Sequence, residues 1–318
     1  MRLYRKLSEL ESFKALFPQR RSALTIGNFD GLHLGHQALL ERVLEAGKAK
    51  GFSTLVLTFE PHPVQVLYPE RGLKRLFDLK DTFEELGRRG LDGLFAIPFS
   101  REFSQLTPQQ FFERYIFEAL NPGLLVVGHD FSFGADRAGS FDTLNQLCKA
   151  RGIEIERIQP VIFDGEPVSS SRIRKLLANG DVALAHKLLK RPFYIHGVVE
   201  KGFARGRTLG FPTANLALAG ETLPTSGVYM TRAHFRGQSH WSVTNVGYNP
   251  TFKGKSEFTP VKIESHLLDF NEDIYGLEIK LEFYEAIRAE KKFDSIEQLK
   301  QQIEKDIEWG RKWIKQRP

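Results

Sequence analysis

The sequence predicts two folded parts: a doubly wound α/β domain, followed by a small antiparallel β-barrel with a terminal helix. In the first half, apolar strand-like runs alternate with helical patterns at roughly thirty-residue intervals, as they do in βαβ units. After about residue 190, short strands with two-residue alternation follow one another between Gly and Pro turns, which is typical of a small barrel. The 318 residues provide for two domains, which we expect at 1–188 and 189–318.

Five apolar runs are the expected strands of the first domain. They lie at 23–27, 54–59, 94–99, 124–128 and 153–158. A helix is expected after the first of them, over 36–49, where apolar residues recur at helical spacing. Because strands joined by helices in this way lie parallel, the first domain should be a Rossmann-like, doubly wound sheet.

The second domain is expected to hold six or so short strands and one helix. Arg191 and Pro192 interrupt the helical run before it. Strands are then expected at 194–200, 228–235, 241–246, 261–268 and 278–284. The last helix should begin with a capping box of Asp294 and Glu297. It should pack on the barrel through a stripe of Ile296, Leu299, Ile303 and Ile307.

The composition is that of a folded chain from a reducing compartment. With 41% hydrophobic and 26% charged residues, the chain is neither disordered nor fibrous. The single cysteine, Cys148, can form neither an intramolecular disulfide nor a thiolate zinc cluster, so the cytoplasm is the expected location. Charges interrupt the first apolar runs, and no stretch approaches about eighteen apolar residues, so neither a signal peptide nor a membrane span is expected.

The net charge of +6 raises the question of a nucleic-acid partner. Lys and Arg are scattered among 39 acidic residues and form no long basic tract. Binding of small polyanions such as nucleotide phosphates explains the positive charge equally well. We therefore expect small-molecule substrates, no nucleic acid and no membrane.

The most informative segment is GNFDGLHLGH, residues 27–36, between the first expected strand and its helix. Its glycines permit close approach of the backbone, and the helix N-terminus offers free N–H groups to a phosphate. His33 and His36 can both face a triphosphate and stabilise the charge that builds as its α-phosphate is attacked. Two histidines at this spacing are, taken alone, more often incidental, and a metal site would need further ligands.

The whole segment is far more specific, because it resembles the signature of nucleotidylyltransferases, in which both histidines bind the ATP phosphates. Three later segments stand in the order found in bacterial FMN adenylyltransferases: TFEPHP (58–63), VVGHDFSFG (126–134) and VSSSRIRKLL (168–177). In the last of these, serines can cap a helix whose first turn carries Arg172 and Arg174. A capped surface helix with two solvated arginines is the alternative for that segment alone.

This resemblance implies catalytic roles for His33, His36 and Arg172 in the transfer of AMP from ATP to FMN. It also implies contacts of the substrates with Gly27, Asn28, Phe29, Asp30, Gly31, Asp130, Ser170, Ser171 and Arg174. His129 departs from the acidic or polar residue that is frequent at its position, and Ser171 replaces a threonine while keeping the hydroxyl.

A second phosphate site is expected beyond residue 200, and it is not a P-loop. NPTFKGKS (249–256) is a near miss that lacks the first glycine and the flanking strand and helix. A better candidate is KGFARGRTLGFPTAN (201–215), whose glycines alternate with Lys201, Arg205 and Arg207. Such a basic loop can close over nucleotide phosphates.

Three residues near this loop favour phosphoryl transfer. Thr213 and Asn215, two apart on an extended segment, point the same way and present oxygen ligands suited to Mg²⁺. Glu264 shares a strand face with Lys262 and His266, opposite the apolar residues, so its carboxylate can point into a site rather than the core. A solvated strand glutamate is the alternative for Glu264 taken alone.

These segments resemble the riboflavin kinase signature G-R-x-L-G-F-P-T-A-N and the second motif of that domain, PVKIESHLLDF (260–270). IRAEKKF (287–293) resembles the segment before its last helix, with alanine where proline is usual. The resemblance implies that Thr213 and Asn215 hold metal and nucleotide and that Glu264 is the general base on the ribityl 5′-hydroxyl. It implies further substrate contacts at Lys201, Gly202, Arg205, Arg207 and Arg288.

The chain as a whole is thus similar to the bacterial bifunctional riboflavin kinase/FMN adenylyltransferase (FAD synthetase) family. Membership implies that the barrel phosphorylates riboflavin to FMN with ATP and Mg²⁺, and that the first domain converts FMN and ATP to FAD and pyrophosphate. It also implies flavin handover to apo-flavoproteins.

Two rival interpretations remain open at this point. One is a monofunctional nucleotidylyltransferase with a regulatory flavin-binding barrel, against which Glu264, Thr213 and Asn215 argue. The other is a flavin-responsive or nucleic-acid-binding protein that has kept the fold, which would bind DNA or RNA in a salt-sensitive way without turning over ATP.

Overall fold

The computed structural model describes residues 1–9, 21–201, 210–218, 222–248 and 261–317. It divides the chain into two compact units, Met1–Ser170 and Ser171–Pro318. None of the described helices is both long enough and apolar enough to cross a membrane.

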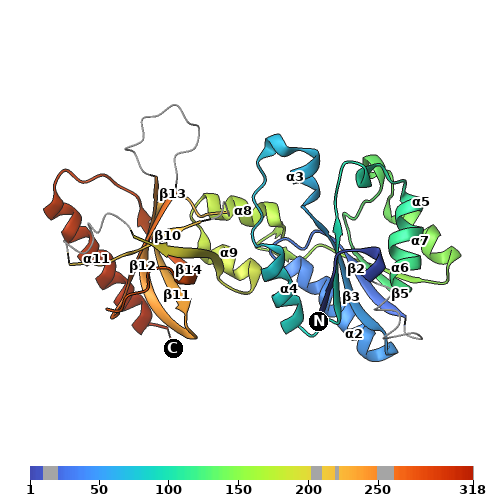
Figure 1. Cartoon of the computed structure of the whole chain (residues 1–318), viewed down its shortest axis with the longest axis horizontal. Helices are drawn as coiled ribbons and strands as arrows, with labels where there is room; N and C mark the ends of the chain where they lie inside the picture. Colours follow the sequence, from blue (N-terminus) through green and yellow to red (C-terminus); the bar gives the residue numbers. More distant parts are fainter. Residues whose placement is uncertain (10–20, 202–209, 219–221, 249–260, 318) are drawn as a thin grey trace. The chain divides into compact units, whose positions relative to one another are not determined.

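The first unit is built on a six-stranded parallel sheet (Figure 1). Its strands stand in the order β1-β4-β3-β2-β5-β6. They are β1 (Arg2–Tyr4), β2 (Ser22–Ile26), β3 (Ser53–Glu60), β4 (Gly93–Pro98), β5 (Pro122–Gly128) and β6 (Glu154–Ile158). The five predicted strands are confirmed within one or two residues. The sequence did not predict β1, because three residues are too short to give a periodic signal.

Helices cover both faces of this sheet. They are α2 (Leu34–Lys50) and α4 (Leu79–Arg88) on one face, and α5 (Pro108–Phe111), α6 (Glu118–Leu120) and α7 (Phe141–Ala150) on the other. The short helix α3 (Pro63–Leu67) follows β3 and buries none of its residues. Shorter turns connect them, namely η1 (Pro69–Arg71), η2 (Phe103–Gln105), the π-helical η3 (Phe112–Phe117) and η4 (Ala135–Arg137), and β7 (Ile162–Phe163) pairs with β8 (Glu166–Pro167).

Alternate residues of the strands feed two separate hydrophobic layers, as a doubly wound sheet requires. Leu24 and Ile26 of β2 pack with the residues of α5, η3, α6 and α7. Their neighbour Ala23 packs instead with α2 and α4. The predicted doubly wound α/β fold is therefore confirmed, and the carboxyl ends of its strands share one edge.

The second unit is a closed six-stranded barrel, also as predicted, with strands in the order β10-β13-β12-β11-β14-β9. All neighbouring strands are antiparallel. The strands are β9 (Phe193–Glu200), β10 (Ala214–Ala217), β11 (Gly227–Phe235), β12 (Gln238–Tyr248), β13 (Val261–Leu267) and β14 (Glu278–Ala289). Helices α8 (Ser170–Ala178) and α9 (Val182–Leu189) precede them, and α9 packs on β14 and β9.

Hydroxyl groups occupy part of the barrel interior. Thr231 bonds to both Ser242 and Thr244, and Thr244 donates to Ser265, all fully buried. Because interior and exterior residues alternate along a strand, this chain of hydroxyls fixes which residues of β12 and β13 face outward.

The last helix, α11 (Ile296–Lys315), packs on β12 as predicted but differs in its details. Ser295 is the N-cap, since its side chain accepts a hydrogen bond from the Gln298 amide, so the predicted capping box of Asp294 and Glu297 is wrong by one residue. The predicted stripe is also wrong at its start, where Ile296 is 64% exposed. Ile307 does pack against the apolar cluster of the barrel as predicted, and the buried residues of the helix are Asp306, Gly310 and Trp313.

Candidate active sites

The loop after β2 is held by buried groups rather than left free. Phe29 and Leu32 are fully buried although both have positive φ angles, of 47° and 46°. The buried carboxylate of Asp30 accepts a hydrogen bond from the Leu76 amide at 2.8 Å, and the Asp30 carbonyl accepts one from Ser170 Oγ at 2.8 Å. Burial of two large side chains and these bonds offset the cost of the left-handed residues.

His33 and His36 lie where this loop becomes helix α2. Their rings stack with centroids 3.7 Å apart, and Phe29 lies against His36 at 5.1 Å. The Nδ1 atom of His33 caps α2 by accepting a hydrogen bond from the backbone amide of His36 at 3.4 Å. In a neutral ring this role leaves the proton on Nε2, so His33 retains one N–H to donate to a ligand. Nδ1 of His36 is buried with no hydrogen-bond partner among the described residues.

Burial keeps both rings neutral in the absence of ligand. It lowers the pKa of His33 to about 4, although the nearby charge of Asp130 opposes the shift. The pKa of His36 is held well below its usual value, chiefly by burial and further by His33. A buried ring nitrogen without a partner beside a helix N-terminus is the arrangement that an anion would complete.

The position of the histidine pair in the sheet also favours a ligand site. The chain turns from β2 towards β3 and β4 on one side, while β5 lies on the other side of β2. The carboxyl ends of β2 and β5 therefore flank a topological switch point, where open α/β sheets bind ligands. His33 follows β2 and Asp130 follows β5, so the structure brings these two predicted residues together.

The remaining residues predicted for this site differ in where their side chains lie. Gly27, Asn28 and Gly31 belong to the loop itself, and Asn28 accepts a hydrogen bond from Thr58 through its carbonyl. Phe29, Asp30 and Ser170 hold the loop. Ser171, Arg172 and Arg174 occupy the first turns of α8 in the second unit.

An aromatic cluster at the same sheet edge was not predicted from the sequence. Phe59 at the end of β3, Phe99 after β4 and Phe131 after β5 are all half-buried. Phe103 lies 6.0 Å from Phe59 and 5.4 Å from Phe99, and Phe131 stacks on Phe133 at 5.5 Å. The signal was present in the sequence, since an aromatic residue ends or follows three successive parallel strands.

In the second unit, cross-strand pairing sets out a row of polar residues on the outside of the barrel. Asn215 of β10 pairs with Glu264 of β13, and Glu264 pairs on its other side with Asn245 of β12. Directly paired residues point to the same face, with Cβ atoms about 4.5–5.5 Å apart. The predicted Asn215 and Glu264 are thus brought together, and Thr213 stands directly before β10.

The atoms in this row are suited to a hard cation. The Oδ1 atom of Asn215 is buried without a hydrogen-bond partner among the described residues. A buried carbonyl oxygen with no donor, next to a hydroxyl and a carboxylate, fits the oxygen ligation of Mg²⁺. Oε1 of Glu264 accepts a hydrogen bond from Lys262 Nζ at 2.5 Å, and the Glu264 side chain is 31% exposed. Glu264 therefore faces outward as predicted, rather than into the core.

Arg288 lies 5.8 Å from the ring of Phe293 and is held in place by α11. Its guanidinium forms a two-pronged ion pair with Asp306 of α11, at 2.8–3.1 Å, and Gln302 donates to the same carboxylate at 2.8 Å. Asp306 is only 4% exposed. Sequence reasoning did not identify this aspartate, which ties the end of β14 to the helix.

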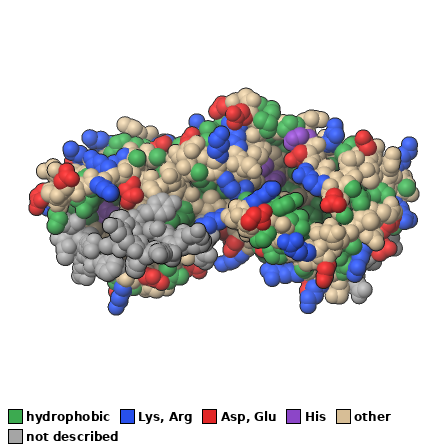
Figure 2. All heavy atoms as spheres, turned by 90° about the horizontal axis from the view of Figure 1, so that it is seen from above, with side chains coloured by type: hydrophobic (Ala, Val, Ile, Leu, Met, Phe, Trp, Pro, Cys, Tyr) green, Lys and Arg blue, Asp and Glu red, His purple; other side chains and the backbone are tan. Residues whose placement is uncertain are grey.

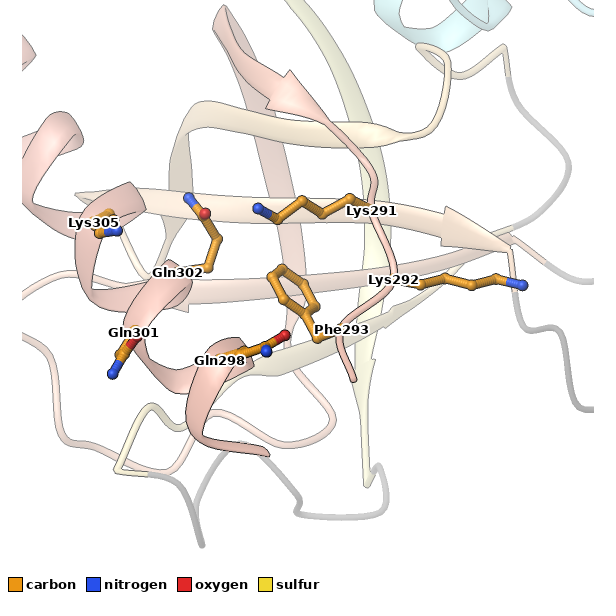
Figure 3. Close-up of a pocket in the computed structure, with 7 residues that line it drawn as sticks. All are labelled: Lys291, Lys292, Phe293, Gln298, Gln301, Gln302 and Lys305. Carbon is orange, nitrogen blue, oxygen red and sulfur yellow. The ribbon is translucent and has the colours of Figure 1, made fainter. Parts of the chain in front are cut away.

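A cavity of about 260 Å³ lies beside this ion pair, between α11 and the segment after β14. Figure 3 shows the ring of Phe293 among the side chains of Lys291, Gln298 and Gln302, while Lys292 points away from it. The lining is completed by Gln301 and Lys305. The lining offers one aromatic ring for stacking, and its other residues are all Lys or Gln.

Part of the predicted kinase site cannot be placed in this way. Gly202, Arg205 and Arg207 lie outside the described residues, as does the P-loop near miss at 249–256. Lys201, the residue before that gap, lies over the ring of Tyr275 at 6.0 Å.

The fold and the family matches define an enzyme that transfers phosphorus groups from nucleotides. The FAD synthetase family model matches residues 17–172, and the riboflavin kinase family model matches residues 189–314. The chain belongs to the family of bifunctional riboflavin kinases/FMN adenylyltransferases, and it is accordingly an enzyme of flavin cofactor biosynthesis.

Named relatives align with most of the chain. The bifunctional riboflavin kinase/FMN adenylyltransferase of Bacillus subtilis is 40% identical over 91% of this chain and 91% of its own. The protein of the same name from Escherichia coli K12 is 38% identical, again over 91% of both chains. A solved structure described as a macrolide-efflux protein from Streptococcus pneumoniae is 34% identical, with a TM-score of 0.85, and covers 93% of this chain and 95% of that one.

Proposed function

We propose that the histidine loop of the first unit adenylylates FMN and that the polar row on the barrel phosphorylates riboflavin. The observation that carries the proposal is the pairing of Asn215 with Glu264, which places an unpartnered metal-ligand oxygen beside a carboxylate. We place the division between the two activities at residue 188, as 1–188 and 189–318. The interval between the two family matches, 172 to 189, supports this choice.

In the first reaction, a phosphate oxygen of FMN attacks the α-phosphorus of ATP, and pyrophosphate leaves. His33 and His36 donate hydrogen bonds to the phosphate oxygens and stabilise the charge that accumulates on them, together with the N-terminus of α2. Arg172 and Arg174 are kept as proposed residues of the same reaction because residues 168–177 resemble the family motif. No covalent intermediate with the enzyme is needed. The test is to supply FMN and ATP, with FAD and pyrophosphate expected in equal amounts.

The half-buried aromatic cluster at this sheet edge is our proposed platform for the FMN ring system. Phe59, Phe99 and Phe131 offer exposed ring surface near the strand ends that carry the histidine loop and Asp130. Offset stacking of a flavin on such rings adds to the energy of burial.

In the second reaction, Glu264 accepts the proton of the ribityl 5′-hydroxyl as its oxygen attacks the γ-phosphorus of ATP, and ADP leaves. Thr213 and Asn215 would hold Mg²⁺, which supplies charge neutralisation at the transferring phosphoryl group when bound. Lys201, Gly202, Arg205 and Arg207 are our proposed contacts to the nucleotide. The cavity beside Phe293 is our proposed site for the isoalloxazine ring, with Arg288 positioning its wall through Asp306.

Removal of the metal-ligand oxygen should shift the Mg²⁺ requirement of one activity only. We expect Asn215→Leu, which keeps the shape but loses the oxygen, to raise the Mg²⁺ concentration for half-maximal FMN formation by at least about tenfold. Adenylylation of supplied FMN should keep its Mg²⁺ dependence. The measurement is a Mg²⁺ titration of both products in the same variant. Unchanged titration curves for FMN formation would remove Asn215 from the metal site.

ATP binding at the histidine loop should take up protons. The pKa of His33 is about 4 in the empty site, and a bound triphosphate raises it by adding negative charge nearby. At a pH between the pKa of His33 in the empty site and its higher pKa in the ATP complex, the complex holds more protons than the free protein. The affinity for ATP should therefore fall as the pH rises through this range. Calorimetry at about pH 5.5, in buffers of different ionisation enthalpy, measures the uptake. The uptake should be smaller in His33→Asn, and identical uptake would contradict the assignment.

The rival functions are less well supported. Among the described residues on the face shown in Figure 2, Lys and Arg side chains are interspersed with Asp and Glu rather than joined into a continuous basic surface. Flavin handover to apo-flavoproteins remains a prediction, as does the cytoplasmic location. The latter is supported by the single cysteine, Cys148, which can form no intramolecular disulfide.

A further inference from the structure

We infer that Asn245 binds the secondary hydroxyls of the ribityl chain and so delivers the terminal hydroxyl of riboflavin to Glu264. This rests on the proposed kinase site, and it adds a substrate-binding residue that neither the motifs nor the family resemblance assign.

The first support is the position of Asn245 in the barrel. It pairs directly with Glu264 across β12 and β13, and its chain neighbours Thr244 and Val246 are both buried in the interior. By alternation, Asn245 faces outward with Glu264, while Thr244 belongs to the interior chain of hydroxyls. That chain locks the register of β12 on β13, so the amide cannot shift relative to the carboxylate without breaking buried hydrogen bonds.

The second support is what lies on the other side of Asn245. A Cβ atom on Gly247 would lie 3.1 Å from Asn245 Nδ2 and 2.5 Å from Glu290 Oε1. The absence of a side chain at Gly247 therefore lets Glu290 reach towards Asn245. Glu290 directly precedes Lys291, the first residue that lines the cavity around Phe293 (Figure 3). Asn245 thus lies between Glu264 and the segment that lines this cavity.

The third support is the surface next to Asn245. Val243, two residues earlier on the same face, is covered by α11 through Gly310 and belongs to the apolar cluster with Trp313. The helix-covered surface thus ends on β12 before Asn245, whose side chain is only half-buried. No described residue forms a side-chain hydrogen bond with it that would compete with a ligand.

The chemistry of the substrate fits this order. Riboflavin carries a flat ring at one end, a terminal hydroxyl at the other and three secondary hydroxyls between them. With the ring at Phe293 and the terminal hydroxyl at Glu264, the secondary hydroxyls must pass Asn245. A carboxamide donates and accepts at once, which matches hydroxyl groups that do the same.

The test compares riboflavin with 10-(5-hydroxypentyl)isoalloxazine bearing the same ring methyl groups, which keeps the terminal hydroxyl but lacks the other three. Full-length Asn245→Leu keeps the shape of the side chain without its hydrogen bonds. We expect kcat/KM for riboflavin to fall about tenfold, mainly through KM. The kcat/KM for the analogue should stay nearly unchanged, and the KM for ATP should be the same as in the unsubstituted protein. Gln238→Leu, an exposed amide at the start of the same strand, is the matched control.

Each outcome decides the inference. Equal losses for riboflavin and the analogue would assign Asn245 a purely structural role, and unchanged kinetics with both would remove it from the site. In either case the kinase assignment would stand. Failure of the unsubstituted protein to phosphorylate riboflavin would instead overturn the proposed function on which the inference rests.

Discussion

The Glu264→Gln variant should lose FMN formation from riboflavin by about two to four orders of magnitude, the range found for removal of a positioned general base. The amide keeps the shape of the side chain but cannot accept the proton of the attacking hydroxyl. Because Glu264 faces outward and is partly exposed, the substitution should leave the barrel folded.

The same variant carries its own control, since it should still convert supplied FMN to FAD. A matched control is Glu278→Gln, which changes an exposed carboxylate of β14 on the same barrel and should phosphorylate riboflavin at the parent rate. Product chromatography measures both reactions. FMN formation by Glu264→Gln at near the parent rate would reduce Glu264 to a solvated strand residue.

The second large effect is expected from His36→Ala, which should lose FAD formation by about a hundredfold or more while FMN formation continues. The imidazole stacks on His33, lies tilted against Phe29 and has one buried nitrogen without a partner among the described residues, so its removal takes away a group that is already positioned. His36→Gln, which keeps a polar group in the space, separates loss of the donor from collapse of the loop.

Kinase activity of the same chain reports whether this variant is folded outside the loop. His196→Ala, at a half-buried histidine on β9 of the barrel, should leave FAD formation unchanged. Equal loss of both activities in folded His36→Ala would contradict the assignment of two separate sites.

Local sequence patterns predicted the architecture well where the signal lies within one element. Apolar runs located the five long strands of the sheet, and alternation along β13 predicted that Glu264 faces away from the core. The motif at residues 27–36 lies, as predicted, between a strand and a helix. Each of these properties depends on residues close together in the chain.

Features that depend on distant residues were not predictable in the same way. The row of Asn215, Glu264 and Asn245 exists only because three strands pair in one register. The ion pair of Arg288 with Asp306 joins β14 to α11. No local sequence pattern links these two residues, because they lie on different elements. The cap of α11 was misplaced by one residue because Asp294 and Ser295 are adjacent and both are good N-cap residues.

The most direct test of two sites in one chain is incubation of the purified protein with riboflavin, ATP and Mg²⁺, followed by chromatography of the flavins over time. We predict that FMN appears first and FAD follows, with ADP and pyrophosphate as the other products. A protein that makes FAD from supplied FMN but never phosphorylates riboflavin would contradict the central claim, because the barrel would then hold no kinase site.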